Sequence, residues 1–180
     1  MLPKSCICAA TNIREPRRNS RAASEKPRAR LTKPAFEEMK NARILIVDDD
    51  PSTVALLEGM LSDHGFTNVL STIDPRRVVA HCREFQPDLI LLDLKMPYLH
   101  GATLLRRIAD VSRGKAVPPV LVITADSSAE TRWLTLEIGA TAFLTKPFDH
   151  QTAWLQIAAL LQIRQEQLAD GLPVSLLPVR

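Results

Sequence analysis

The sequence predicts an α/β fold, a doubly wound five-stranded parallel sheet with helices on both of its faces. Short unbroken apolar runs recur along residues 41–165, and such runs are typical of parallel strands that are covered on both faces. Stretches of helical length and periodicity separate these runs, with prolines and glycines at the junctions. Since crossovers between parallel strands are right-handed, a doubly wound sheet is the simplest topology.

The expected elements alternate along the chain. The five strands are expected at the apolar runs 44–47, 69–70, 89–92, 120–123 and 142–144. The five helices are expected at roughly 52–64, 75–85, 101–112, 127–138 and 150–169. The first helix closes with His64 and Gly65, a cation in the last turn and then a glycine at the C′ position, which is typical of a helix end.

Residues 1–40 differ from the rest of the chain in composition. They hold ten Lys and Arg against four Glu, a net charge of +6, and they show neither helical nor strand periodicity. We expect a disordered basic extension, because such a segment buries too little apolar surface to offset its ordering entropy. Three interpretations stay open: an Arg-rich transit peptide, a basic arm for nucleic acid or anionic lipid, and an inert extension.

The composition of the rest of the chain, residues 41–180, excludes several classes of protein. Residues 41–180 hold thirteen Lys and Arg against sixteen Asp and Glu, so they lack the basic face that nucleic-acid binding needs. No apolar run approaches the ~18 residues of a membrane span. Three cysteines make no disulfide framework, which indicates a reducing compartment, and we expect the cytoplasm.

Polar side chains follow four of the five expected strands. Asp48 and Asp49 come after the first strand, Asp93 after the third, Thr124 at the end of the fourth and Lys146 after the fifth. The carboxyl ends of parallel strands meet at one edge of a sheet, where ligands bind. Two carboxylates about 5 Å apart repel by about 3 kcal/mol at an effective dielectric of ~20. A divalent cation such as Mg²⁺ removes that repulsion.

The same edge suits phosphoryl chemistry. An aspartate in this setting can act as a nucleophile and form an aspartyl phosphate. The ammonium of Lys146 and the hydroxyl of Thr124 are groups that bind phosphoryl oxygens. The sequence therefore predicts a Mg²⁺-assisted phosphoryl site.

Four motifs together resemble the receiver domain of bacterial response regulators, over about residues 42–165. They are Ile-Leu-Ile-Val-Asp-Asp-Asp-Pro at 44–51, Pro-Asp-Leu-Ile-Leu-Leu-Asp-Leu-Lys-Met-Pro at 87–97 with Gly101, Val-Ile-Thr-Ala at 122–125, and Gly-Ala-Thr-Ala-Phe-Leu-Thr-Lys-Pro-Phe at 139–148. The resemblance implies a flavodoxin-like sheet with strand order 2-1-3-4-5. It also implies two-component signalling with Mg²⁺ as the only cofactor.

The resemblance assigns roles to the residues at the sheet edge. Asp93 is the phosphoacceptor. Asp48, Asp49 and Asp93, with the backbone carbonyl of Lys95, hold Mg²⁺. Thr124 and Lys146 contact the phosphoryl group.

Further roles follow from the same resemblance. The peptide bond before Pro147 is cis, and Phe143 is the aromatic switch residue. The switch works through a surface made of the fourth helix, the fifth strand and the fifth helix. We expect Trp133 and Trp154 on the helices that border this surface.

Some positions depart from the commonest pattern of the family. His100 stands where an acidic residue is usual, and we expect it to face solvent. Asp50 is a third acid that caps the following helix. Lys95 and Asp126 overlook the site from opposite loops, where an ion pair between them would shield the phosphoryl group from water and lengthen its lifetime.

The implied function is that of a phosphoacceptor rather than an enzyme with turnover. Its partners are a sensor histidine kinase or phosphotransfer protein and a downstream protein target, and a homodimer formed on phosphorylation is compatible with it. Residues 166–180 extend the last helix and end in a short tail, which leaves no room for a DNA-binding domain. The protein is then either a stand-alone receiver or one that lacks its output domain. The alternative is a haloacid-dehalogenase-like Mg²⁺ phosphatase with Asp48 as its nucleophile.

Overall fold

Five parallel strands form the sheet in the computed structural model, which describes residues 39–97, 101–112 and 117–170. The strands are β1 (Ile44–Val47), β2 (Val69–Thr72), β3 (Leu89–Leu92), β4 (Val120–Thr124) and β5 (Ala142–Thr145). Their order in the sheet is β2-β1-β3-β4-β5, and all four neighbouring pairs are parallel. The predicted fold class and strand order are confirmed.

The helices connect the strands as expected. They are α2 (Pro51–Asp63), α3 (Val78–Phe85), α4 (Gly101–Val111), α5 (Ala129–Ile138) and α6 (His150–Asp170). The single helix expected at 75–85 is instead a short 3₁₀ turn, η1 (Pro75–Arg77), followed by α3. The side chain of Asp74 accepts a hydrogen bond from the backbone N–H of Arg76, which starts this turn separately from the helix.

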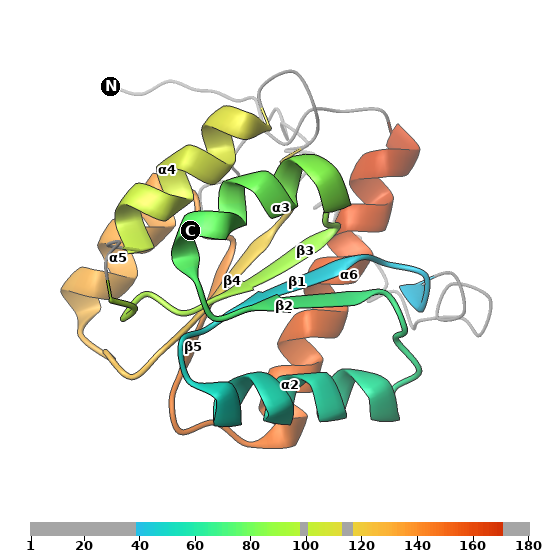
Figure 1. Cartoon of the computed structure of the whole chain (residues 1–180), viewed down its shortest axis with the longest axis horizontal. Helices are drawn as coiled ribbons and strands as arrows, with labels where there is room; N and C mark the ends of the chain where they lie inside the picture. Colours follow the sequence, from blue (N-terminus) through green and yellow to red (C-terminus); the bar gives the residue numbers. More distant parts are fainter. Residues whose placement is uncertain (1–38, 98–100, 113–116, 171–180) are drawn as a thin grey trace, which may run out of the picture. The chain divides into compact units, whose positions relative to one another are not determined.

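The sheet is covered on both faces, which explains its unbroken apolar strands (Figure 1). Along β1, Ile44 and Ile46 pack with α2 and α6, while Leu45 and Val47 pack with α3 and α4. Successive side chains of a strand point to opposite faces, so both faces need apolar residues.

The start of α2 shows why three acids in a row follow β1. Asp50 is the N-cap, and its carboxylate accepts hydrogen bonds from the backbone N–H of Ser52 and the hydroxyl of Thr53, both at 2.9 Å. Pro51 occupies the first helical position, where its missing N–H is not needed. The predicted capping role of Asp50 is therefore confirmed. At the other end, Gly65 has a φ of +85°, as expected of a C′ glycine.

The packed part of the chain includes Met39, near the end of the predicted extension. Met39, placed by sequence reasoning in the disordered extension, is only 1% exposed and belongs to the same apolar cluster as α2 and α6. The rest of the predicted extension, 1–38, lies outside the described residues. Composition alone does not locate this boundary, because Met39 is a single apolar residue next to a basic, polar stretch.

At the other end of the chain, α6 continues to Asp170, five residues past the predicted end of the receiver domain. The tail at 171–180 lies outside the described residues. Within the described part of the chain, no helix is both long enough and apolar enough to cross a membrane.

Candidate functional site

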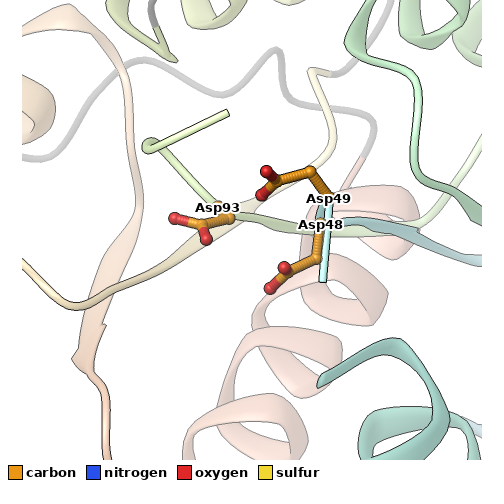
Figure 2. Close-up of side chains that lie close together, drawn as sticks. All are labelled: Asp48, Asp49 and Asp93. Carbon is orange, nitrogen blue, oxygen red and sulfur yellow. The ribbon is translucent and has the colours of Figure 1, made fainter. Parts of the chain in front are cut away.

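Three carboxylates converge at the carboxyl end of the sheet. Asp48 and Asp49 follow β1 and Asp93 follows its neighbour β3, and one carboxylate oxygen of each lies within 4.8 Å of the others. Figure 2 shows the three side chains leaving the ends of the two strands, with those of Asp48 and Asp49 diverging. Asp48 is 2% exposed and Asp93 6%, whereas Asp49 is half-buried. The sequence-predicted acids therefore come together as expected.

Backbone hydrogen bonds carry the sheet pairing one residue beyond the strands. The N–H of Asp93 donates to the carbonyl of Val47 at 2.8 Å, and the N–H of Asp48 donates to the carbonyl of Thr72 at 3.3 Å. One oxygen of each acid accepts a bond from a loop N–H, Asp48 Oδ1 from Asp50 and Asp93 Oδ1 from Lys95, both at 3.0 Å. These bonds fix the two carboxylates in place.

Lys146 brings a single ammonium into the cluster. Its Nζ donates to Asp48 Oδ2 at 2.7 Å and to Asp93 Oδ2 at 2.9 Å. Its backbone N–H donates to the carbonyl of Thr124 at 2.8 Å, which anchors the loop after β5 to the end of β4. The Lys146–Pro147 peptide bond is cis, as the resemblance implied.

The electrostatics of the cluster are unbalanced toward negative charge. Burial raises the pKa of Asp48 above its ordinary value, although the hydrogen bond from Lys146 opposes the shift. Burial alone would lower the pKa of Lys146, but its hydrogen bonds to Asp48 and Asp93 outweigh that effect and raise it. The cluster thus contains three carboxylates and one ammonium, which binds two of them.

The donor set fits a hard divalent cation. All three side chains offer carboxylate oxygens, the ligands that Mg²⁺ prefers. The side chain of Asp49 makes no hydrogen bond or ion pair with any other described residue, so its carboxylate oxygens are available to bind a cation. A cation of this kind would also relieve the repulsion between the carboxylates.

Thr124 ends β4, between β3 and β5, and is fully buried. Its hydroxyl oxygen accepts a hydrogen bond from the backbone N–H of Asp126 at 3.3 Å. The residue therefore lies at the predicted edge of the sheet, with its hydroxyl proton free to point elsewhere.

Lys95 and Asp126 face each other from the loops after β3 and β4. Lys95 Nζ lies 4.0 Å from Asp126 Oδ2, and the lysine side chain is largely exposed. Asp126 also binds the start of α5, whose N-cap is Ser128: its carboxylate accepts bonds from the Ser128 N–H at 3.0 Å and the Thr131 hydroxyl at 3.1 Å. The bond from Ser128 is the main cause of the lowered pKa of Asp126. Sequence reasoning missed this second role of Asp126 in holding α5.

The predicted switch surface corresponds to α5, β5 and α6. Phe143 on β5 is buried on the face covered by α3, α4 and α5, and the guanidinium carbon of Arg132 lies 5.7 Å from its ring centroid. Trp133 on α5 is 62% exposed. Trp154 is on α6 as expected, but its ring stacks on His64 at the end of α2, at 3.6 Å between ring centroids. Trp154 therefore packs toward the opposite face of the sheet.

Gly101, part of the second motif, is required by a close approach that the sequence does not show. A Cβ atom there would lie 2.8 Å from the Cα atom of Leu94, the residue after Asp93. The loop carrying Asp93 thus rests directly on the first turn of α4. His100, just before it, lies outside the described residues.

Comparisons with known proteins agree with this geometry. A family model described as the response regulator receiver domain matches residues 44–158. The protein PilH of Pseudomonas aeruginosa is 38% identical over 120 residues, which are 67% of this chain and 98% of PilH. The response regulator PleD of Caulobacter vibrioides is 35% identical over 124 residues, 69% of this chain but only 27% of PleD.

Solved structures give the same result. The structure of a CheY-like receiver domain protein from Methanospirillum hungatei aligns with 71% of this chain and with 98% of its own chain, with a TM-score of 0.64 and 25% sequence identity. The receiver domain of the Francisella response regulator 1452 covers 68% and 98%, with a TM-score of 0.60 and 25% identity. The comparisons give no support to the haloacid-dehalogenase alternative.

Proposed function

Because this chain belongs to the response regulator receiver domain family of two-component systems, we propose that it accepts a phosphoryl group on Asp93. The observation that carries the proposal is the cluster of Asp48, Asp49 and Asp93, in which the ammonium of Lys146 binds Asp48 and Asp93. A sensor histidine kinase or a phosphotransfer protein supplies the phosphoryl group. The protein is then a phosphoacceptor that undergoes only its own phosphorylation and dephosphorylation.

Asp48 and Asp49 hold Mg²⁺ together with Asp93 and the backbone carbonyl of Lys95. When bound, Mg²⁺ neutralises charge between the carboxylates and the incoming phosphoryl oxygens. Asp49 supports this assignment because its carboxylate has no other partner among the described residues.

The transfer itself needs little from the protein beyond position and charge. A carboxylate oxygen of Asp93 forms the new bond to phosphorus while the bond from phosphorus to the donor's imidazole nitrogen breaks, and the imidazole keeps that electron pair. Lys146, already 2.9 Å from Asp93 Oδ2, compensates the charge of the phosphoryl oxygens. The Thr124 hydroxyl donates a hydrogen bond to one of them.

Phosphorylation with acetyl phosphate, followed by intact-protein mass spectrometry, tests this assignment. We expect one added phosphoryl group in the wild type and none in Asp93→Asn. Asp63→Asn, which makes the same chemical change at the exposed end of α2, should label like the wild type. Labelling that persists in Asp93→Asn, or that is complete in the presence of EDTA, would contradict the proposal.

Lys95 and Asp126 shield the phosphoryl group from an in-line water. Their contact of 4.0 Å across the two loops supports this role. We expect Lys95→Asn to lose the phosphoryl group several-fold faster than the wild type, and Lys95→Arg to keep the wild-type rate, because it retains the charge. Asp126→Ala should also accelerate the loss. Equal decay in all four proteins, measured after the donor is removed, would leave both residues without this role.

The signal leaves through the surface formed by α5, β5 and α6. Capture of the phosphoryl group by Thr124 draws its loop inward, and Phe143 moves with it, a shift between two packings. Trp133 reports on this surface, whereas Trp154, stacked on His64, serves as an internal control. With beryllofluoride, amide shifts near Phe143 and Trp133 should change while those of Trp154 stay constant. Unchanged shifts at Phe143 would exclude the coupling.

Through this surface the protein contacts a downstream protein in the cytoplasm. Phosphorylation also leads to formation of a homodimer. Two arrangements are compatible with the relatives. The chain spans nearly all of PilH, which favours a stand-alone receiver, and about a quarter of PleD, which favours a regulatory part of a longer protein. The size of the native gene product, measured with an antibody against this chain, distinguishes them.

A further inference from the structure

A groove between α3 and α4 carries features that the phosphoryl site does not use. Its volume is ≈ 380 Å³, and it is lined by Arg76, Val79, Arg83, Arg107, Asp110 and Val111. The three arginines and the aspartate are exposed, while the two valines are half-buried. The groove is therefore open to solvent, with an apolar floor and a charged rim.

The charge of this region is opposite to that of the rest of the body. Residues 41–180 carry thirteen Lys and Arg against sixteen Asp and Glu. Within them, η1 with its cap, α3 and α4 carry five arginines against three acids, Asp74, Glu84 and Asp110. A local surplus of guanidinium groups on an acidic body attracts anions to this place.

The arginines come from three elements and are arranged around the groove. Arg76 is fixed by Asp74, which accepts from its Nε and its Nη2, each at 2.9 Å. That pair lowers the pKa of Asp74 to about 2, so Asp74 stays charged and holds Arg76 in place at neutral pH. Arg83 on α3 and Arg107 on α4 stand on the two helices that form the walls. Guanidinium groups so placed can bind carboxylates in pairs.

The exposure, charge and apolar floor of the groove fit one kind of anionic ligand better than others. A small anion would remain mostly in water here, because the lining charges are exposed and small-ligand sites bury most of their ligand. A nucleic acid carries a phosphate on every nucleotide and needs a longer basic surface than this groove, whose lining also contains Asp110. An acidic peptide with apolar side chains matches both the rim and the valine floor.

We propose that the α3/α4 groove docks an acidic segment of a protein partner, with its carboxylates on Arg83 and Arg107 and an apolar side chain on Val79 and Val111. This docking surface is separate from the α5–β5–α6 surface.

The probe for the test is a synthetic peptide of alternating Glu and Leu, titrated into the full chain. The readout is local, the backbone amide shifts of Val79 and Val111, because the basic residues 1–40 also attract an acidic peptide. We expect saturable shifts at both valines. The peptide with Gln in place of Glu should leave them unchanged.

The double variant Arg83→Glu/Arg107→Glu should weaken binding about tenfold or more, since two charge-assisted contacts become repulsions. The matched control is Arg77→Glu/Arg106→Glu, which makes the same change in charge on η1 and α4 at side chains that do not line the groove. It should bind within about twofold of the wild type, because its effect acts only at longer range through screened charge. A second variant, Arg83→Gln/Arg107→Gln, removes the contacts without introducing new charge and should also bind weakly.

Four results would overturn the proposal. They are an absence of shifts at Val79 and Val111, equal weakening by the two charge-reversal variants, equal binding of the Gln peptide, and tighter binding of single-stranded oligo(dT) at the same two valines. The last result would assign the groove to nucleic acid.

Discussion

The two ends of the sheet carry the same kinds of charged groups in opposite proportions. At the carboxyl end, three carboxylates, those of Asp48, Asp49 and Asp93, lie together, and the ammonium of Lys146 binds two of them, Asp48 and Asp93. At the amino end, the one carboxylate of Asp88 lies between the guanidinium groups of Arg43 and Arg164. At the amino end, the chain itself supplies the positive charge that Asp88 needs. The carboxyl end is left with a surplus of negative charge, which a cation can neutralise.

The amino end is a structural joint. Arg43 Nε and Arg164 Nε each lie 3.6 Å from an oxygen of Asp88, and the backbone N–H of Arg43 donates to Asp88 Oδ2 at 3.0 Å. Asp88 precedes β3, Arg43 precedes β1 and Arg164 is on α6. These contacts fasten the later part of α6 to the sheet, beyond residue 158, where the match to the family model ends.

The largest difference between the two ends should be seen in stability. Asp88→Ala removes the hydrogen bond from the Arg43 N–H and the carboxylate that lies 3.6 Å from the guanidinium group of Arg164, a residue that is 9% exposed, and we expect a loss of about 2–3 kcal/mol of unfolding free energy. Asp49→Ala removes a carboxylate that has no partner among the described residues, so stability should stay within about 0.5 kcal/mol or rise. Urea unfolding without divalent cations measures both. A larger loss of unfolding free energy in Asp49→Ala than in Asp88→Ala would contradict this account of the two ends.

Packing, rather than charge balance, should hold the loop at the carboxyl end. In Gly101→Ala, the new methyl group would lie 2.8 Å from Leu94 Cα, and we expect a loss of about 1–3 kcal/mol. Gly59→Ala is the matched control, because nothing lies within 4 Å of a Cβ atom on this exposed turn of α2. That variant should gain up to about 1 kcal/mol from helix propensity. Thermal and urea unfolding should give opposite signs for the two variants, and a shared sign would contradict the account.

The surplus charge should also set the affinity for Mg²⁺. Lys146 competes with a cation for Asp48 and Asp93, so Lys146→Met should bind Mg²⁺ about tenfold more tightly, equivalent to ~1.4 kcal/mol. Lys95→Met, which removes an ammonium that contacts neither Asp48 nor Asp93, is the control and should change the affinity less than about twofold. Titration calorimetry provides the measurement. Weaker binding by Lys146→Met would mean that the lysine orients the carboxylates more than it opposes the cation.

The smallest effect concerns pH. Burial raises the pKa of Asp48 above 3.8, so the folded protein binds this proton more tightly than the unfolded chain does. The contribution of Asp48 to stability therefore falls as the pH rises from 3.8 through the raised pKa, and is constant above it. The unfolding free energy of the wild type minus that of Asp48→Asn should decrease across this window. An increase would show that the bond to Lys146 dominates the titration.

Sequence reasoning located the carboxyl end of the sheet well and the amino end not at all. Asp48, Asp93 and Lys146 each follow a recognisable apolar run, so topology alone brings them to one edge. Arg43 and Asp88 are 45 positions apart, and Arg164 looks like any polar residue on an amphipathic helix. The sequence did not predict the stacking of Trp154 on His64 for the same reason, because helix rotation and long-range pairing depend on tertiary packing.

Three identical residues in a row after β1 occupy three different environments. Asp48 is buried against Lys146, Asp49 is half-buried, and Asp50 is an exposed helix cap. Substitution tolerance should therefore change completely from one position to the next within a run of uniform composition. Asn or Ser can replace Asp50 at little cost, because they cap helices as well as aspartate does. The same exchange at its two neighbours alters the charge of the site, so anyone redesigning this loop can use Asp50 as the position to vary.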